Sequence, residues 1–109
     1  MRRFGLKESD IEAICAVFSR NAQIEKAVLY GSRAKGNYKT GSDIDLTLLG
    51  DEALTLDALY RVMNDIDDLL LPYTFDLSIF HKIGDPEMIA HIQRVGIAFY
   101  EKGKATPVI

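Results

Sequence analysis

The sequence predicts an α+β domain in which a mixed β-sheet is covered by helices mainly on one face. Helix-like and strand-like segments alternate along the chain, and one pair of successive strands is joined by a loop rather than by a full helix. The chain has 109 residues, of which 48 % are apolar and 27 % are charged. This composition is typical of one globular domain, which we place at residues 1–103, followed by a tail at 104–109.

The first 41 residues are predicted to contain one helix, one strand and a loop. Ser9 and Glu12 have the spacing of a capping box, which predicts a helix that begins there and ends near Asn21. The apolar run Ala27–Tyr30 predicts a short strand. The segment 31–41, GSRAKGNYKTG, is rich in glycine and predicts a loop with at most one helical turn.

Alternation of polar and apolar residues predicts two further strands, over Asp43–Leu49, whose first half alternates strictly, and over Thr74–Phe80. An amphipathic helix is predicted between them, from Thr55 to Leu70. After the second of these strands, the pair Asp85–Pro86 predicts the start of another helix that runs to about Val95.

The end of the chain is predicted to form a last strand over Ile97–Tyr100. Gly96, just before it, is expected to be the left-handed cap of the preceding helix. His91, in the middle of that helix, is expected to face solvent.

Charge and composition exclude several classes of protein. With 13 basic and 16 acidic residues the net charge is −3, which argues against general nucleic-acid binding. The single cysteine, Cys15, excludes an internal disulfide and a multi-cysteine zinc site, and its place on an apolar stripe predicts a core residue. No apolar run resembles a signal peptide or is long enough to span a bilayer, so we expect a soluble, cytoplasmic protein without membrane contact.

Three aspartates in the predicted strands are the candidate catalytic and metal-binding residues. Asp43 and Asp45 are two residues apart, so they share a face with Cβ atoms about 6–7 Å apart. Asp76 lies between Phe75 and Leu77 in the later strand. Aspartate is disfavoured in strands, and such local conflicts concentrate at functional sites. The alternative for the Asp43–Asp45 pair is a solvated strand end, and for Asp76 an edge-strand charge.

A cluster of aspartates without nearby histidine or cysteine predicts a hard dication. The three carboxylates would repel one another unless a cation lay between them. Mg²⁺, or Mn²⁺, prefers a few carboxylate oxygens together with waters and phosphates. Two such ions about 3.5–4 Å apart can clamp the attacking and leaving oxygens of an in-line displacement.

The glycine-rich loop supplies a candidate phosphate site. Gly31 and Ser32 directly follow a strand, where backbone amides can cradle an anion and the hydroxyl can donate to a phosphate oxygen. Arg33 adds positive charge, and Ser42 lies at the far end of the loop beside the aspartates. We take these four residues as the candidate nucleotide-binding set. Neither a Walker loop nor a GxGxxG motif is present.

Together these motifs resemble a known family. Gly31-Ser32, ten intervening residues, Asp43-Ile44-Asp45 and then Asp76 on a later strand resemble the nucleotidyltransferase superfamily with the DNA polymerase beta fold. Within it, GSRAKG followed by GSDIDL is similar to the minimal nucleotidyltransferases, or MNT proteins. The resemblance extends from Ala27 to Tyr100 and makes residues 1–103 a single minimal nucleotidyltransferase domain.

The resemblance implies transfer of a nucleoside monophosphate, here AMP from ATP, to a hydroxyl group. It implies that Asp43 and Asp45 hold two Mg²⁺ ions and the nucleotide phosphates, while Asp76 completes the metal site and helps to activate the acceptor. It also implies a helical HEPN-domain partner, since several such pairs resemble toxin–antitoxin systems in which the MNT member adenylylates the HEPN toxin. So small a chain leaves no room for a second domain, so we expect another subunit to supply the acceptor.

Two other functions remain open at this point. The chain could be a non-catalytic subunit that binds nucleotide and neutralises a HEPN partner by contact alone. It could also be a transferase for small molecules, such as an aminoglycoside-modifying enzyme, which shares the core motif. The sequence identifies neither the preferred base, nor the acceptor, nor the oligomeric state.

Overall fold

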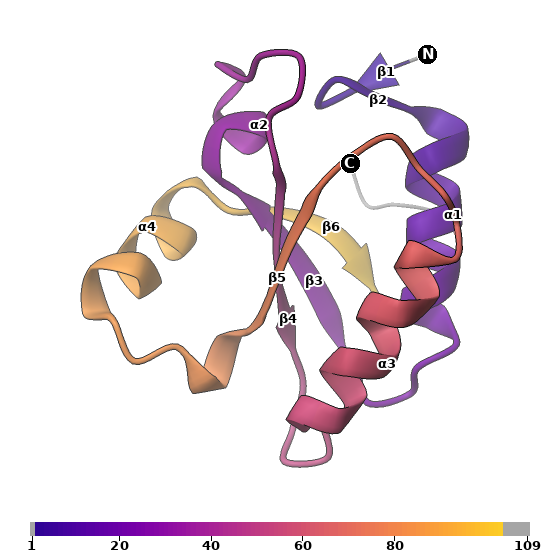
Figure 1. The fold of residues 1–109 in the computed structure, drawn as a ribbon. Coiled ribbons are helices and arrows are strands. Elements are labelled where there is room, and N and C mark those ends of the chain that lie inside the picture. Colours follow the sequence, from indigo (N-terminus) through magenta and orange to yellow (C-terminus); the bar gives the residue numbers. More distant parts are fainter. Residues whose placement is uncertain (1, 104–109) are drawn as a thin grey trace.

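The computed structural model describes residues 2–103, and the predicted tail at 104–109 lies outside them. A four-stranded sheet of order β5-β4-β3-β6 forms its centre (Figure 1). β3 is antiparallel to both of its neighbours, whereas β4 and β5 are parallel, so the predicted mixed sheet is confirmed. The strands are β3 (Lys26–Tyr30), β4 (Ile44–Leu49), β5 (Phe75–Ile79) and β6 (Ile97–Glu101).

Helices cover both faces of this sheet unequally. Figure 1 shows α1 (Glu8–Ser19) and α3 (Leu56–Asp67) side by side on one face and α4 (Pro86–Val95) on the other side. A short helix, α2 (Gly31–Lys35), follows β3, and a 3₁₀ turn, η1 (Phe80–Lys82), follows β5. The two longest helices therefore share a face, in agreement with the predicted α+β class. Within residues 2–103, no helix has the length and apolar character needed to cross a membrane.

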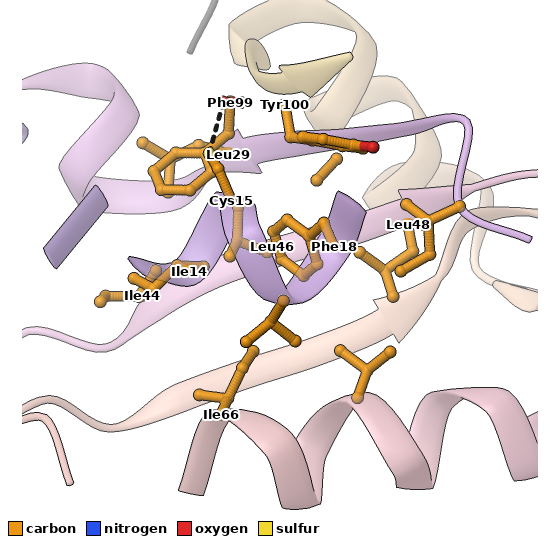
Figure 2. Close-up of a cluster of buried hydrophobic side chains, with 14 of the residues drawn as sticks. Ile14, Cys15, Phe18, Leu29, Ile44, Leu46, Leu48, Ile66, Phe99 and Tyr100 are labelled. Atoms are coloured by element: carbon orange, nitrogen blue, oxygen red, sulfur yellow. Dashed lines mark hydrogen bonds between the residues drawn. The ribbon is translucent and has the colours of Figure 1, made fainter. Parts of the chain in front are cut away.

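The core lies between the sheet and the pair α1 and α3 (Figure 2). Alternate residues of β4 (Ile44, Leu46 and Leu48) point into it and are fully buried. Phe18 of α1 meets Phe99 of β6 edge to face, with ring centroids 6.5 Å apart. Because the β4 residues alternate, Asp45 and Thr47 necessarily point to the opposite face of the sheet. The hydrophobic pattern that builds the core thus also fixes where the aspartate points.

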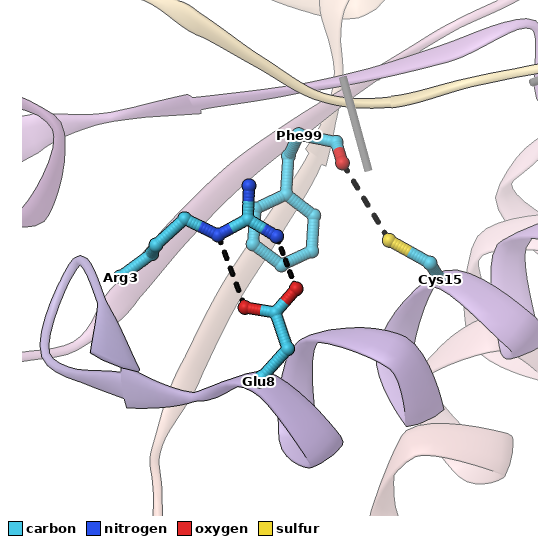
Figure 3. A network of polar contacts seen from close by, with 4 residues as sticks. All are labelled: Arg3, Glu8, Cys15 and Phe99. Atoms are coloured by element: carbon cyan, nitrogen blue, oxygen red, sulfur yellow. Dashed lines mark hydrogen bonds and ion pairs between the residues drawn. The ribbon is translucent and has the colours of Figure 1, made fainter. Parts of the chain in front are cut away.

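A small amino-terminal hairpin precedes α1, and the sequence did not predict it. Its strands are β1 (Arg2–Arg3) and β2 (Leu6–Lys7), each too short to carry a periodic pattern. The chain passes from β2 directly into α1, whose first residue is Glu8. Arg3 Nε donates to Glu8 Oε2 at 3.1 Å and so ties the hairpin to the first turn (Figure 3). The predicted Ser9–Glu12 capping box is wrong, because the cap position is Lys7 and it makes no side-chain cap.

Two of the other predicted helix ends are confirmed and one is wrong. Asp85 caps α4 by accepting from the backbone N–H of Glu87 at 3.0 Å. Thr55 caps α3 by accepting from the backbone N–H of Ala58 at 3.3 Å. Gly96, however, is extended, with φ −64° and ψ 142°, and is not a left-handed cap. A Cβ atom there would lie 2.4 Å from the Ile92 carbonyl oxygen, so this position needs a glycine because the chain approaches α4 closely.

Candidate functional site

Two of the three candidate aspartates are direct neighbours across the sheet. In the parallel pairing of β4 with β5, Asp45 is the register partner of Asp76. Because the two strands are parallel, they start at the same end of the sheet. Both carboxylates therefore lie near that end and on the same face. Asp45 is half-buried, whereas Asp76 is exposed on the edge strand. The pairing of the two strands therefore brings these two residues close together, as predicted.

The third candidate, Asp43, lies at the same end of the sheet. It immediately precedes β4 and is exposed, as is Thr74, which immediately precedes β5. The Thr74 hydroxyl donates a hydrogen bond to Asp43 Oδ1, so this carboxylate is held across the gap between the two strand starts. The sequence did not single out Thr74, although its place just before a strand carrying Asp76 could have suggested it.

The electrostatics of the site reveal uncompensated negative charge. Burial raises the pKa of Asp45 above its ordinary value, and the charges of Asp76 and then Asp43 raise it further. Arg33 and His91 lower this pKa, but they do not offset the other causes. The site therefore favours the arrival of a cation or a proton.

Gly31 places the start of α2 against Asp45. Tyr30, the last residue of β3, is the register partner of Asp45 in the antiparallel β3–β4 pair. Gly31 follows with φ +75°, and a Cβ atom on it would lie 2.3 Å from Asp45 Oδ2. Only a glycine fits both the left-handed backbone and this close approach. Ser32, half-buried, comes next in α2, so the candidate phosphate loop and the aspartates adjoin each other.

Arg33 has a different setting from a solvated loop arginine. Its side chain is 4 % exposed, with Nη1 donating to the Phe4 carbonyl at 2.8 Å. Nε and Nη2 both donate to the Ser42 carbonyl, at 3.1 and 2.8 Å. The guanidinium also lies over the rings of Tyr38 and Tyr73, 5.4 and 5.7 Å from their centroids. These contacts hold the loop in place, and phosphate contact by Arg33 stays a prediction.

Ser42 likewise contributes to the shape of the loop. Its Oγ accepts from the backbone N–H of Lys39 at 2.8 Å, and its carbonyl is the acceptor used by Arg33. Ser42 is therefore fixed one residue before Asp43. A direct contact between Ser42 and a nucleotide stays a prediction.

His91 and Tyr30 belong to the surroundings of the site, which the sequence did not reveal. The rings of Tyr30 and His91 meet edge to face, with centroids 6.2 Å apart, so the prediction that His91 faces solvent is wrong. Burial raises the pKa of Tyr30, a hydrogen bond with Ser78 lowers it, and the charges of Asp76 and Asp45 raise it. The apolar period of α4 does not identify which of its sides meets the sheet, because few of its residues are fully buried.

The carboxylates of the candidate site are suitable ligands for Mg²⁺. Carboxylate oxygens are the ligands that hard dications prefer, and a bound cation would offset the charges that raise the pKa of Asp45. Within residues 2–103, no three carboxylate, imidazole or thiol groups are arranged so that they could hold one ion between them. Mg²⁺ usually takes one or two carboxylates and completes its shell with water and substrate phosphates, so a closed protein cage is not required.

Comparison with known proteins places this geometry in context. The family model for polymerase beta nucleotidyltransferases matches residues 12–105. A search of curated proteins found no match. Among solved structures, a toxin–antitoxin complex with AMP-PNP is similar with a TM-score of 0.69 at 19 % identity, over 90 % of this chain and 76 % of the other.

Two further structures share the fold. A protein described as a minimal nucleotidyltransferase is similar with a TM-score of 0.64 at 24 % identity, over 82 % of this chain and 88 % of the other. A complex of tri-AMPylated Shewanella oneidensis HEPN toxin with MNT antitoxin is similar with a TM-score of 0.64 at 16 % identity, over 86 % and 71 %. The match to the family model covers most of the sequence, and this chain therefore belongs to the polymerase beta nucleotidyltransferase family.

Proposed function

We propose that this chain transfers AMP from ATP to a hydroxyl group of a HEPN-domain protein and thereby acts as the antitoxin of a toxin–antitoxin pair. The observation that carries the proposal is the register of Asp45 with Asp76, with Gly31 packed against the Asp45 carboxylate. The similar structures support ATP as donor and a HEPN protein as acceptor, since one holds AMP-PNP and another an AMPylated HEPN toxin. We expect this reaction in the cytoplasm.

In the proposed reaction, the acceptor oxygen attacks the α-phosphorus of ATP and pyrophosphate leaves. The backbone at Gly31 and the hydroxyl of Ser32 are assigned to the triphosphate, which the start of α2 would face. Asp43 and Asp45 are assigned to the metal ions, expected to be two Mg²⁺ or Mn²⁺, which would offset charge on the phosphates. Asp76 is exposed on the edge strand, so it is assigned to complete the metal site and to receive the proton of the acceptor hydroxyl.

The test uses the purified chain, the HEPN protein encoded beside it, Mg²⁺ and ATP labelled in the α-phosphate. Label should appear on the HEPN protein. The double variant Asp43→Asn with Asp45→Asn should lose it, because both metal-binding carboxylates are neutral. Asp51→Asn is the matched control, since this exposed aspartate follows the far end of β4. Full labelling by the double variant would contradict the assignment.

Metal binding is tested without turnover. Mg²⁺ should stabilise the unmodified chain by binding its folded state, by about 1.4 kcal/mol of unfolding free energy at ten times the dissociation constant, and should therefore raise its thermal midpoint. The double variant should show no such increase. An equal increase in both proteins would place the ion elsewhere.

A non-catalytic subunit that neutralises its partner by contact is the second candidate. The observation that favours it is that no three metal-binding side chains within residues 2–103 form a ready ligand set. Suppression of the partner by the double variant, at the level of the unmodified chain and without labelling, would establish this alternative. A labelled small hydroxyl compound in place of labelled protein would instead indicate a small-molecule transferase.

A further inference from the structure

Helix α3 carries an exposed apolar stripe that lies beside the face that packs in the core. Leu56, Tyr60 and Met63 are 50 %, 55 % and 39 % exposed, although they are large and hydrophobic. Their spacing of four and three residues places them in one row along the helix. The buried residues of α3 lie beside this row: Ala58, Leu59, Val62 and Ile66. The stripe therefore extends the apolar surface of α3 beyond what the core needs.

The stripe continues into a groove between α3 and the edge strand β5. The groove has a volume of about 280 Å³ and is lined by Met63 and Ile66 from α3 and by Phe75 and Leu77 from β5. Its lining also includes Thr74, whose hydroxyl donates a hydrogen bond to Asp43. From Leu56 to the end of α3 the stripe and groove run for about 16 Å, at 1.5 Å per residue. This apolar path ends at Thr74, beside Asp43, at the end of the sheet that carries the candidate carboxylates, although Asp45 and Asp76 point to the opposite face.

Negative charge predominates around this path. Residues 51–68 contain six carboxylates and one cation, Arg61. Three of the carboxylates, those of Asp57, Asp67 and Asp68, are exposed on or directly after α3. Three cations, Lys7, Arg33 and Lys39, line another cleft of about 750 Å³, which shares Tyr73 with the groove.

We propose that the stripe and groove on α3 and β5 dock the acceptor protein through an amphipathic helix whose apolar residues are flanked by lysine or arginine. The proposal rests on the proposed function, because the docked protein is the acceptor, and the path ends at Thr74, whose hydroxyl donates to Asp43. Apolar side chains of the partner helix would cover Leu56, Tyr60 and Met63. Its basic residues would face the carboxylates at the margin of the stripe.

A second copy of this chain fits the same surface poorly. Pairing two α3 helices would bring the carboxylates of one copy against those of the other, with one arginine on each. Like charges placed together across an interface oppose association. Charge complementarity therefore favours a basic partner over self-association.

The experiment measures binding of the HEPN protein encoded beside this chain by isothermal titration, in Mg²⁺ without ATP. Met63→Glu and Tyr60→Glu should each weaken binding about tenfold or more, as loss of a central apolar contact does. The triple variant Asp57→Lys, Asp67→Lys, Asp68→Lys should also bind more weakly. Raising the salt concentration should weaken binding of the unmodified chain but not of the triple variant.

The matched control is Met88→Glu. Met88 lies on α4 and is 38 % exposed, against 39 % for Met63, so both variants place a charge at an equally exposed methionine. Circular dichroism and the thermal midpoint check that each variant is folded. Binding of folded Met63→Glu and Tyr60→Glu at the affinity of Met88→Glu would overturn the proposal. Absence of binding by the unmodified chain, or a dimer of this chain that Met63→Glu disperses, would also overturn it.

Failure of this docking surface can be told apart from failure of the proposed reaction. If the variants weaken binding but the unmodified chain transfers no label, the docking stands and the transfer is contradicted. If label is transferred and the variants bind normally, the transfer stands and the acceptor docks elsewhere.

Discussion

Asp45 on β4 and Asp76 on β5 are register partners in a parallel pair, so their carboxylates lie at the same end and on the same face of the sheet. The relationship follows from pairing rather than from side-chain rotamers, because opposed residues on neighbouring strands always share a face. The charge of Asp76 acts on Asp45 as a result and helps to raise its pKa. The fold thus holds two like charges together at a cost in stability.

That cost should depend on pH. The pKa of Asp45 is raised above its ordinary value of 3.8 by burial and then by Asp76 and Asp43, so the folded chain binds this proton more tightly than the unfolded chain does. Stability is therefore lost as the pH rises from that ordinary value through the raised one, and the loss persists at pH 7. Asp45→Asn should raise the thermal midpoint at pH 7, and the gain should shrink below pH 3.8.

Thermal unfolding at both pH values, compared with the unmodified chain, measures this effect. The control is Glu52→Gln, an exposed carboxylate beyond the opposite end of β4, which should shift the midpoint at neither pH. A lower midpoint for Asp45→Asn at pH 7 would contradict the expectation and would mean that Asp45 accepts hydrogen bonds that outweigh the repulsion.

Gly31→Ala should destabilise the chain more than Gly36→Ala. Both glycines have left-handed backbone, with φ +75° and +87°, where an alanine costs about 1–2 kcal/mol. At Gly36 an added Cβ has no heavy atom within 4 Å, whereas at Gly31 it would lie 2.3 Å from Asp45 Oδ2. The crowding should add about 1 kcal/mol or more at Gly31 alone. Urea unfolding of both variants isolates this difference, and equal losses would show that Asp45 moves aside without cost.

Arg33→Lys should lower stability by about 2 kcal/mol or more, because lysine cannot reproduce the planar fork that serves two carbonyls. The carbonyls of Phe4 and Ser42 would lose their buried donor, and the amino-terminal hairpin would lose its tie to the loop. Lys35→Arg, an exposed exchange on the same helix, should leave stability unchanged. Urea unfolding without nucleotide decides the role. Unchanged stability with weakened ATP binding would instead support the phosphate contact predicted for Arg33.

The sequence predicted helices and strands well where neighbouring residues alone determine the conformation. The alternation around Asp45 and around Asp76 gave both strands, because one face of each meets the core. The Asp85–Pro86 pair gave the start of α4, because a capping side chain and a proline act within one turn. In these segments the sequence and the tertiary structure favour the same conformation.

Features that depend on distant contacts were not predictable in this way. The setting of Arg33 depends on a hairpin 29 residues earlier in the chain, and no local pattern encodes that contact. His91 faces Tyr30 because α4 packs against α2 and the central strand β3. Gly96 is extended for a similar reason, since the return of the chain to β6 brings it against Ile92 and Val28. The strand order was not predicted, and that Asp76 joins Asp43 and Asp45 at one site was implied only by the resemblance to the family.

Cys15 should resist alkylation in the folded protein. Its thiol is buried in the core and donates to the Phe99 carbonyl at 3.5 Å (Figure 3). Burial raises its pKa to about 12, so the reactive thiolate would be about one part in ten thousand at pH 8. Alkylation by iodoacetamide should therefore follow the urea unfolding curve and should be complete only in unfolded protein. Rapid labelling without urea would contradict this and would mean that α1 opens locally away from β6, as a free thiol reacts readily only when it is exposed and ionised.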